Sequence, residues 1–432
     1  MKRTLPPAAD SPTRLFLVAT LLACPAAAQG VVWVVDDDGG PGVDFVEIQD
    51  AVDATADGDT VLVRDGLYAD FQVVDKHLAI LADVDAAPYA AAIDVLDLAA
   101  GRVTSLHGLR SRELSIEDCL GVVWVEGHTS SSGRPACDVV ESTDVVVVDS
   151  VFSGASGSSP SLFSYESNSP GRGIDLTNST VHLYGVTSSG GGGAPGWVGG
   201  PTGGGGGTGL RFTGIDFVYA SGCDFRGGSG GPGYSPVATS LFGSEMCGSG
   251  GSGAAGVSLG NADELVHRGC TFLGGSAGIG GKVLLFGSTE ILQQCNDGFP
   301  GSPISAGSGA VVTEIVRPHR SFAVNSPARE GETLTLDFEG QPGDLAFLFL
   351  SVGTAPFYNQ PCGGSILFDA GSFLTVATTP VDSRGLATLS VPVPVFGPQP
   401  ALHFYVQANF VDTLGDCNVS SGSVLTLLDA SL

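Results

Sequence analysis

The chain has 432 residues, of which 65 are glycine, 18 are basic and 45 are acidic, so its formal net charge is −27. Glycine is about twice as frequent as in ordinary globular proteins, where it makes up ~7% of residues. The acidic balance excludes a nucleic-acid-binding protein, which needs a basic surface. A hydrophobic content of 43% excludes disorder along the whole chain, and glycines without a three-residue period exclude collagen. The length predicts two or three domains.

The first 28 residues have the order of features found in an export signal. Three basic residues precede an apolar segment at 15–23, which is too short to span a bilayer as a stable helix, and alanines at 26–28 then resemble a cleavage site. We expect cleavage after Ala28 and export of the rest of the chain. The alternative is a lipid anchor on Cys24, which follows a Leu-Leu-Ala run. No later segment has about 18 uninterrupted apolar residues, so we expect no transmembrane span in the exported chain.

The exported part keeps an even number of cysteines, which in an exported chain predicts disulfides. The pairs that lie nearest in sequence are the expected ones: Cys119 with Cys137, and Cys362 with Cys417. The sequence has no Cys-x-x-Cys pair and no Cys/His cluster with the spacing of zinc ligands.

Residues 31–83 combine one short helix with several closely spaced strands. The apolar run 31–35 predicts a strand, and the acidic residues after it predict a solvated turn that alternatively suits Ca²⁺ (Asp36, Asp37 and Asp38). Asp44 lies three residues before Glu47, as in a capping box, and predicts a helix of about three turns that ends near Gly58. The strands that follow leave no room for crossover helices. They can pair in parallel only if the chain coils around itself.

Three motifs in this segment resemble the amino-terminal segment of right-handed parallel β-helix proteins. They are Ile-Gln-x-Ala-Val at 48–52, Gly-Asp-Thr-Val-x-Val at 58–63 and Gly-x-Tyr at 66–68. The group includes the pectin-lyase-like superfamily and the copper-site accessory proteins of nitrous oxide reductase. The resemblance covers about 50 residues and implies a fold rather than an activity. It implies that the helix covers the open end of the first coil and prevents end-to-end pairing.

Four segments of 17 residues align along the middle of the chain and predict stacked coils. In each, apolar residues recur two positions apart, and the fifteenth position holds Ser150, Thr187, Cys223 or Cys270. This alternation predicts short strands that bury their apolar face only against a neighbouring coil. We therefore expect an all-β, right-handed parallel β-helix over 31–315 with a capping helix at its amino-terminal end. The copies begin at Ala136, Gly173, Gly209 and Gly256, and a degraded fifth begins at Gly281.

Insertions follow the last position of successive copies, at 153–172, 190–208 and 226–255. Because the point of insertion is constant, we expect loops that emerge from one edge of the β-helix, one above another. Aromatic side chains in these loops would stack on sugar rings, or else they anchor glycine-rich loops to the body. These candidate ligand-binding residues are Phe163, Tyr165, Trp197, Tyr234 and Phe242.

The pattern changes near Arg317, after which apolar runs alternate with turn residues up to the end of the chain. These runs predict a β-sandwich over 316–432, held by the pair Cys362 and Cys417. Domains of this kind often end large exported bacterial proteins as attachment or sorting modules, which is an analogy and not a role assigned by these residues.

Enzymes of the superfamily that the chain resembles cleave acidic polysaccharides. Their lyases use Ca²⁺ or cationic side chains with an Arg or Lys base, whereas Lys76 and Lys282 are the lysines left after cleavage. Their hydrolases use three neighbouring aspartates, a Gly-His-Gly and an Arg-x-Lys, of which Gly-His-Thr at 127–129 is the nearest fragment. The negative charge of the chain also repels polyanions. The catalytic candidates that adjacent coils would bring together are Asp224, Arg226, Asp263, His267 and Arg268.

These observations predict an exported, non-catalytic β-helix repeat protein that serves as a cell-surface or extracellular scaffold, adhesin or glycan-binding module. The expected partners are carbohydrates or cell-surface proteins and not nucleic acid. No cofactor is expected apart from Ca²⁺ at the acidic turn. The alternative is a polysaccharide lyase or glycoside hydrolase of the pectin-lyase-like superfamily that uses the five catalytic candidates.

Overall fold

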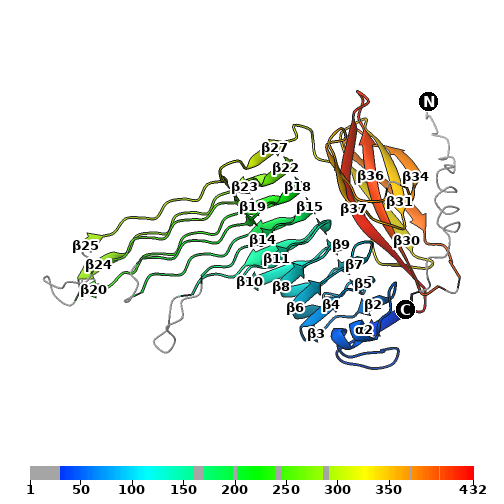
Figure 1. Ribbon diagram of the computed structural model, residues 1–432, viewed down its shortest axis with the longest axis horizontal. Helices are drawn as coiled ribbons and strands as arrows, with labels where there is room; N and C mark the ends of the chain where they lie inside the picture. The colour runs from blue at the N-terminus through cyan, green and yellow to red at the C-terminus, as the bar shows by residue number, and fades with distance from the viewer. Residues whose placement is uncertain are drawn as a thin grey trace, which may run out of the picture.

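The computed structural model describes residues 30–158, 169–197, 202–238, 246–285, 291–369, 371–397 and 399–432. Three parts are visible in Figure 1: a column of stacked strands, a long arm that leaves one edge of the column, and a twisted sandwich on its other side. The expected signal peptide 1–28 lies outside the described residues. So do the anchor candidate Cys24 and the candidate ligand-binding residues Phe163, Tyr165 and Phe242.

The column is a parallel β-helix built from two sheets whose strands pair with the equivalent strands of the next coil. Sheet A pairs, in order, β1 (Val32–Val35), β2 (Thr60–Val63), β5 (Leu78–Ala82), β7 (Val103–His107), β9 (Val122–Glu126), β12 (Val145–Val148), β15 (Thr180–Tyr184), β18 (Phe217–Ser221), β22 (Glu264–Arg268) and β27 (Val311–Glu314). The predicted fold class, a parallel β-helix followed by a sandwich, is confirmed.

Sheet B bends around the other two sides of each coil. Its first side holds β10 (Thr129–Gly133), β13 (Val151–Gly154), β16 (Thr187–Ser189), β19 (Asp224–Arg226) and β23 (Thr271–Leu273). Its second side holds β11 (Cys137–Val140), β14 (Ile174–Thr177), β17 (Leu210–Thr213), β21 (Val257–Leu259) and β26 (Ile304–Ala306). The sides join through β8 (Arg110–Glu117), which pairs with β6 (Tyr89–Leu96) and through it with β3 (Leu67–Tyr68) and β4 (Phe71–Val74).

The alternation seen in the sequence places one face of each strand inside the column. In sheet A the column Val145, Val181, Val218 and Leu265 is in register from coil to coil and fully buried in the core. The second copy of the repeat has one residue fewer in its first turn, so Val186, and not Thr187, aligns with Ser150 and Cys223. The register Val151–Thr187–Asp224 shows this correction.

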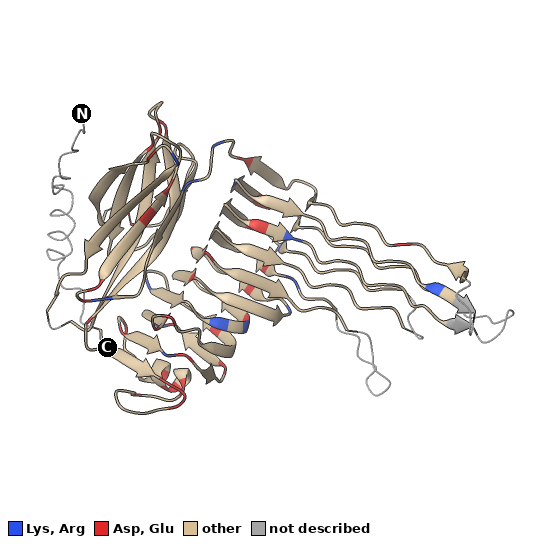
Figure 2. Cartoon of the chain, turned by 180° about the vertical axis from the view of Figure 1, so that it is seen from behind, with Lys and Arg blue, Asp and Glu red and all other residues tan. Residues whose placement is uncertain are grey.

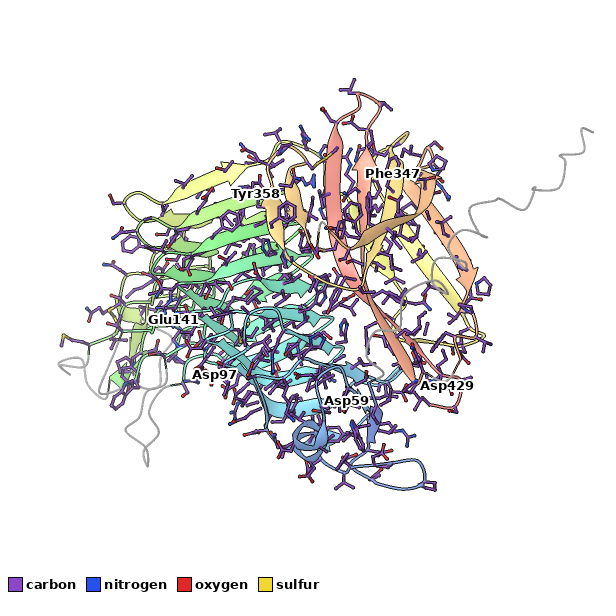
Figure 3. All side chains as sticks on the ribbon, turned by 45° about the vertical axis from the view of Figure 1, so that its right-hand side comes forward. Asp59, Asp97, Glu141, Phe347, Tyr358 and Asp429 are labelled. Carbon is purple, nitrogen blue, oxygen red and sulfur yellow. A yellow bond between two sulfur atoms is a disulfide. The ribbon has the colours of Figure 1, made fainter. Side chains whose placement is uncertain are left out.

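One corner of the β-helix is turned by residues in the left-handed conformation, one per coil. Asp75, Asp97, Asp118, Glu141 and Asn178 all have φ between 45° and 56°. Asp and Asn tolerate this conformation better than most residues. Their amides donate to the next coil, for example from Asp97 to the Glu117 carbonyl at 3.0 Å. Asp97 and Glu141 are labelled on this corner in Figure 3.

The helix α2 (Ile48–Ala54) covers the amino-terminal end of the column with Ile48, Ala51 and Val52 buried. The predicted capping box is wrong. The Asp44 carboxylate instead accepts from the Val34 amide at 2.9 Å, and the N-cap residue Glu47 makes no side-chain cap bond. None of the helices in the described part of the chain has the length and apolar character needed to cross a membrane.

The carboxyl-terminal part is a sandwich of two sheets around its own core. One sheet holds β28 (Ser321–Val324), β30 (Thr333–Glu339) and β35 (Leu386–Pro392); the other holds β29 (Ala328–Arg329), β37 (Cys417–Leu428), β36 (Ala401–Val411), β31 (Leu345–Ser351) and β34 (Phe373–Pro380). A hairpin of β32 (Phe357–Asn359) and β33 (Gly364–Ile366) lies beside them. The expected disulfide Cys362–Cys417 is present. The expected pair Cys119 and Cys137 is not, because both thiols are free and buried in separate places of the core.

The sandwich packs against the outer face of sheet A. Trp124, Tyr184 and Tyr219 project from that face into a shared apolar cluster with sandwich residues, and the rings of Trp124 and Tyr405 lie 5.5 Å apart. Polar bonds cross the same interface, such as that from the Tyr184 hydroxyl to the Ser365 carbonyl at 3.0 Å. Figure 3 shows Tyr358 between the two parts, where its ring lies 5.5 Å from Tyr219. The outer face of sheet A is therefore occupied by the chain itself.

The inserts form an ordered arm and not separate loops. The second and third inserts run outward from sheet B at 190–197 and 227–234 and return at 202–208 and 248–255 (Figure 1). The segment after β23 also runs outward, at 274–281, and returns at 295–302. The segment from Gly281 was predicted to be a degraded fifth copy of the repeat, but it belongs to a fourth excursion, which is an outward and returning pair of passes of the arm. The last coil is completed by β26 and β27. At the far end lie β20 (Val237–Ala238), β24 (Lys282–Leu285) and β25 (Ile291–Gln294), and the disulfide Cys247–Cys295 joins two returning passes. Figure 2 shows few charged residues along the arm.

Backbone hydrogen bonds connect neighbouring passes of the arm every three residues. In one set, amides donate to carbonyls between outward and returning passes, over 2.7–3.0 Å. Nearest the column these bonds run from Gly207 to Gly191, from Gly228 to Gly207 and from Ala254 to Gly228. Three residues farther out they run from Gly204 to Ala194, from Gly231 to Gly204 and from Gly251 to Gly231. A second set joins passes of the same direction, as from Gly193 to Ser229 and from Gly230 to Ser276. The inserts therefore do have a local three-residue period, which is that of an extended helix without internal hydrogen bonds.

Glycine predominates at two of the three positions, with alanine at a few such as Ala194 and Ala254, because the passes lie so close together. A Cβ atom on Gly228, Gly231 or Gly251 would lie well inside 3.0 Å of a carbonyl oxygen in a neighbouring pass. The third position points outward and accepts side chains. It is exposed at Ser229, Pro232, Ser276, Ile279 and Phe299.

Candidate functional site

The structure does not bring the five catalytic candidates to one face. Asp224 and Arg226 pair with each other on β19, with Nε and Oδ2 2.9 Å apart, and Arg226 is largely exposed. Asp263 is fully buried in the turn before β22, where its carboxylate accepts from the Gly260 amide at 2.5 Å and the Asp216 amide at 3.3 Å. These contacts give Asp263 a structural role in the corner of the coil.

His267 and Arg268 are adjacent on β22 and therefore point to opposite faces of sheet A. His267 faces the column and packs edge-on against Phe272, with ring centroids 4.9 Å apart. Arg268 is fully buried under the sandwich and donates to the Val419 carbonyl at 2.6 Å and the Asn418 side chain at 3.4 Å. The expected convergence of the five residues is wrong, because strand alternation separates two of them and the sandwich covers one.

The acidic turn at Asp36, Asp37 and Asp38 brings three carboxylates within 4.8 Å of one another. Two of them already bind groups of the chain: Asp36 pairs with Arg64 at 3.2 Å, and Asp37 accepts from the Leu67 amide at 3.0 Å. The turn therefore fixes the start of the first coil to the next one, and these bonds account for two of its carboxylates without a metal.

Trp197 and Tyr234 are the two predicted ligand-binding aromatics that lie within the described residues, and both are half-buried in the outer part of the arm. The Gly196 amide donates to the Pro232 carbonyl at 2.7 Å, which sets the two aromatics on neighbouring outward passes at nearly the same distance from the column. The arm thus carries them away from the body, where the alternative role of anchoring loops to the body does not apply.

A row of polar side chains that the sequence analysis did not select runs along the outer face of the second side of sheet B. Asp94, Ser115, Asp138, Asp175 and Arg211 are in register on consecutive coils, and we call them the outer ladder. Their strand neighbours on either side point into the core. A repeat signal was present, because Asp138, Asp175 and Arg211 each occupy the third position of their copy.

Two neighbouring carboxyl groups of the ladder have different surroundings. Asp175 is 5% exposed. Its two carboxylate oxygens each accept a hydrogen bond of 2.7 Å from Arg211, and one of them also accepts a hydrogen bond of 3.0 Å from Arg172. Asp138 has no such partner among the residues that the structure describes. Burial raises the pKa of Asp138 to about 6, with help from the charges of Asp175 and Glu117. The ladder therefore offers a fixed carboxylate beside a carboxyl group that holds its proton into mildly acidic pH.

A hollow of about 470 Å³ lies at the amino-terminal end of the ladder, between α2 and the first strands of sheet B. Lys76 closes one side of it by donating to the last carbonyls of the helix, at 3.0 Å for Thr55 and 3.2 Å for Asp53. Burial also raises the pKa of Asp94 there, followed by the charges of Glu117 and Glu113. The lining residues are Gln49, Val52, Asp53, Asp70, Gln72, Val74, Lys76 and Asp94.

The raised pKa of Asp138 predicts a pH-dependent effect of Asp138→Asn. A carboxyl whose folded-state pKa lies above its unfolded value contributes stability that is present below pH ~3.8 and is lost as the pH rises past about 6. We expect the variant to match the parent at pH 4 and to be more stable at pH 8 by about 1 kcal/mol, a value reduced for solvent screening. Urea denaturation at both pH values measures this, with the exposed Asp50→Asn as control. Equal effects at both pH values would contradict the assignment.

No protein-family model matches the chain. No curated protein matches it either. Among solved structures, the enzymatically active domain of tailspike protein 2 of bacteriophage CBA120 is 9% identical, with a TM-score of 0.26 over 94% of this chain and 72% of that one. The corresponding domain of tailspike protein 4 of the same phage is 12% identical, with a TM-score of 0.13 over 86% of this chain and 64% of that one. Likeness at these TM-scores assigns neither a family nor an activity.

Proposed function

We propose that this chain is an exported, non-catalytic binding protein whose arm presents a carbohydrate-binding end away from the β-helix body. The ordered, hydrogen-bonded arm is the observation that carries the proposal, since long ordered extensions serve contact at a distance rather than catalysis. The dispersal of the five catalytic candidates agrees with it. The sandwich, docked on sheet A, would leave the arm free while attaching the molecule.

Export and surface location are part of the proposal. The signal-like residues 1–28 support export, with cleavage after Ala28 or lipid attachment at Cys24 as the two outcomes. The two disulfides, Cys247–Cys295 and Cys362–Cys417, agree with an oxidising compartment.

A neutral glycan is the partner that best suits the arm. The three-residue pattern places small polar side chains and backbone carbonyls along its faces, with few charges (Figure 2). Trp197 and Tyr234 add aromatic surface that stacks on sugar rings and a hydroxyl group that hydrogen-bonds to them. The acidic composition of the chain repels anionic polysaccharides.

A glycan array with a parallel assay for turnover tests the proposal. We expect binding to neutral glycans without cleavage, and about tenfold weaker binding after Trp197→Ala or Tyr234→Ala. Phe357→Ala is the matched control, because this aromatic residue is 42% exposed on the sandwich, away from the arm. Failure to bind any glycan, or binding unchanged by both arm variants, would contradict the proposal.

The second candidate function is glycoside hydrolysis on the outer ladder. Asp138 and Asp175 come from adjacent coils, and one holds its proton while the other is fixed by Arg211, which is the division of roles that acid catalysis by two carboxyl groups needs. This function would be favoured if the parent chain cleaves a glycan on the array and Asp138→Asn still binds that glycan but no longer cleaves it. Turnover that survives Asp138→Asn would contradict it.

A further inference from the structure

Two free cysteines lie beside one another in the turns before β19 and β23, the strands from which the third insert and the following excursion of the arm leave the β-helix. Cys223 and Cys270 precede the register partners Asp224 and Thr271 on adjacent coils, and the Thr271 amide donates to the Cys223 carbonyl at 2.8 Å. Each follows a glycine in the left-handed conformation, Gly222 and Gly269, so the two side chains leave equivalent turns in the same direction. The Cys223 thiol donates to the Ser221 carbonyl at 3.4 Å, and the Cys270 thiol donates to the Arg268 carbonyl at 3.5 Å. The two thiols are close enough that each shifts the pKa of the other.

The spacing and exposure of the pair suit a reversible disulfide. Neighbouring strands lie about 4.8 Å apart, which falls inside the ~4.4–6.8 Å range of Cα separations found in disulfides. Cys223 is buried at 2% exposure, whereas Cys270 is partly exposed at the edge of the core. When a partly exposed thiol lies next to a buried one, the exposed thiol reacts first with an oxidant or a small disulfide, and the buried thiol then forms a disulfide with it.

We propose that Cys223 and Cys270 form a redox-responsive disulfide that joins the third and fourth excursions of the arm at the points where they leave the β-helix. The Cys270 thiolate attacks a small disulfide such as oxidised glutathione, a Cys270–glutathione bond forms, and one glutathione thiolate leaves. Cys223 then loses its proton and attacks the Cys270 sulfur, which releases the second glutathione. The pair loses two protons and two electrons, and the oxidised glutathione becomes two thiols.

The surroundings of the two thiols support the order of these steps. The neighbouring Cys223 thiol lowers the pKa of Cys270, whereas burial raises that of Cys223. The Cys247–Cys295 disulfide already joins the arm farther out. The new bond would join the same two excursions next to the column, so oxidation would link them at both ends.

Thiol mapping on the purified chain tests the proposal. After incubation with oxidised glutathione under native conditions, the protein is denatured, alkylated and mapped by mass spectrometry. We expect a cross-linked peptide that joins Cys223 to Cys270, while Cys119 and Cys137 remain alkylated. These two buried thiols serve as internal controls, because Cys137 is in register with Leu114 and Ile174, and the Cys119 amide donates to Ser142 of the next coil.

Single-cysteine variants test the order of attack. Cys223→Ser should trap glutathione on Cys270, and Cys270→Ser should leave Cys223 unmodified. The cross-link should also slow cleavage of the arm by a broad-specificity protease at least about threefold relative to the alkylated chain. The proposal would be overturned if both Cys223 and Cys270 could still be alkylated after oxidation. It would also be overturned if glutathione stayed bound to Cys270 in the parent chain. These outcomes do not depend on glycan binding.

Discussion

Gly231→Ala should unfold the middle of the arm while leaving the β-helix and sandwich folded. The added methyl group would collide with the Ala194 carbonyl, and Gly231 also bonds to Gly204 and accepts from Gly251. The clash and the lost hydrogen bonds together cost about 3 kcal/mol of local stability. Cleavage within the arm by a broad-specificity protease should therefore become roughly 100-fold faster, because it follows the population of the open form.

Ser229→Ala is the matched control for this experiment. Ser229 is in the same pass but at the outward third position, where its side chain is exposed and makes no hydrogen bond among the described residues. We expect its cleavage rate to stay within about twofold of the parent. Equal rates for Gly231→Ala and Ser229→Ala would show that the inserts are ordinary loops.

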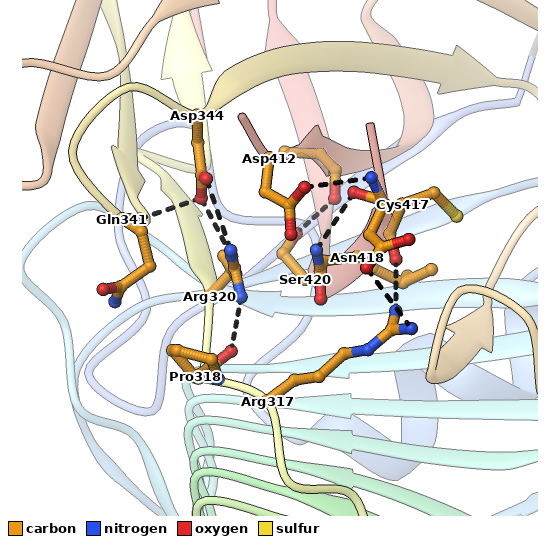
Figure 4. Close-up of polar contacts among 12 residues, drawn as sticks. Arg317, Pro318, Arg320, Gln341, Asp344, Asp412, Cys417, Asn418 and Ser420 are labelled. Carbon is orange, nitrogen blue, oxygen red and sulfur yellow. Dashed lines mark hydrogen bonds and ion pairs between the residues drawn. The ribbon is translucent and has the colours of Figure 1, made fainter. Parts of the chain in front are cut away.

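Arg320→Ala should destabilise the sandwich by about 3–5 kcal/mol, because it leaves a buried charge without its partner. Arg320 and Asp344 are both almost fully buried and are joined by contacts of 2.9 and 3.3 Å (Figure 4). Arg320 also donates to the Pro318 carbonyl at 2.8 Å, in the segment that enters the sandwich. Urea denaturation followed by the fluorescence of aromatic residues measures the loss.

Arg384→Ala provides the comparison within the same sandwich. Arg384 pairs with Asp382 at 2.9 Å, but its side chain is 77% exposed. An exposed pair contributes at most about 1 kcal/mol, so we expect little change. A loss of less than about 1 kcal/mol for Arg320→Ala would contradict the buried-pair account.

The β-helix and the sandwich were predictable because both depend on local alternation. Residues such as Val145, Val181 and Val218 repeat an apolar pattern two residues apart, and strands of that kind bury their faces only by stacking or pairing. The one-residue difference in the second copy was not visible, because a shortened turn leaves the alternation on either side of it intact.

The arm was not predictable from the same patterns. Its passes are held by hydrogen bonds to segments between 10 and about 50 residues away, such as Gly204 to Ala194 and Gly230 to Ser276. Each pass is short, and the reversal between outward and returning passes interrupts the three-residue period. Glycine-rich segments therefore read as loops, although here glycine is the residue that permits the close packing.

The candidate site was predictable only in part. Asp138 and Asp175 share a repeat position, which the alignment contained, but their importance depends on burial and on the position of Arg211 one coil farther on. The opposite orientations of His267 and Arg268 follow from strand alternation alone. The cover over Arg268 does not, since it comes from Val419 and Asn418, about 150 residues later.

Residue-resolved amide hydrogen exchange across 248–256 tests the ordered arm most directly. Amides of Gly250, Gly251, Gly253 and Ala254 donate to neighbouring passes, whereas those of Ser249, Ser252 and Ala255 donate to no group in the described part of the chain. The account predicts slow exchange at the first set and fast exchange at the second, repeated every three residues. Uniformly fast exchange through the segment would contradict it.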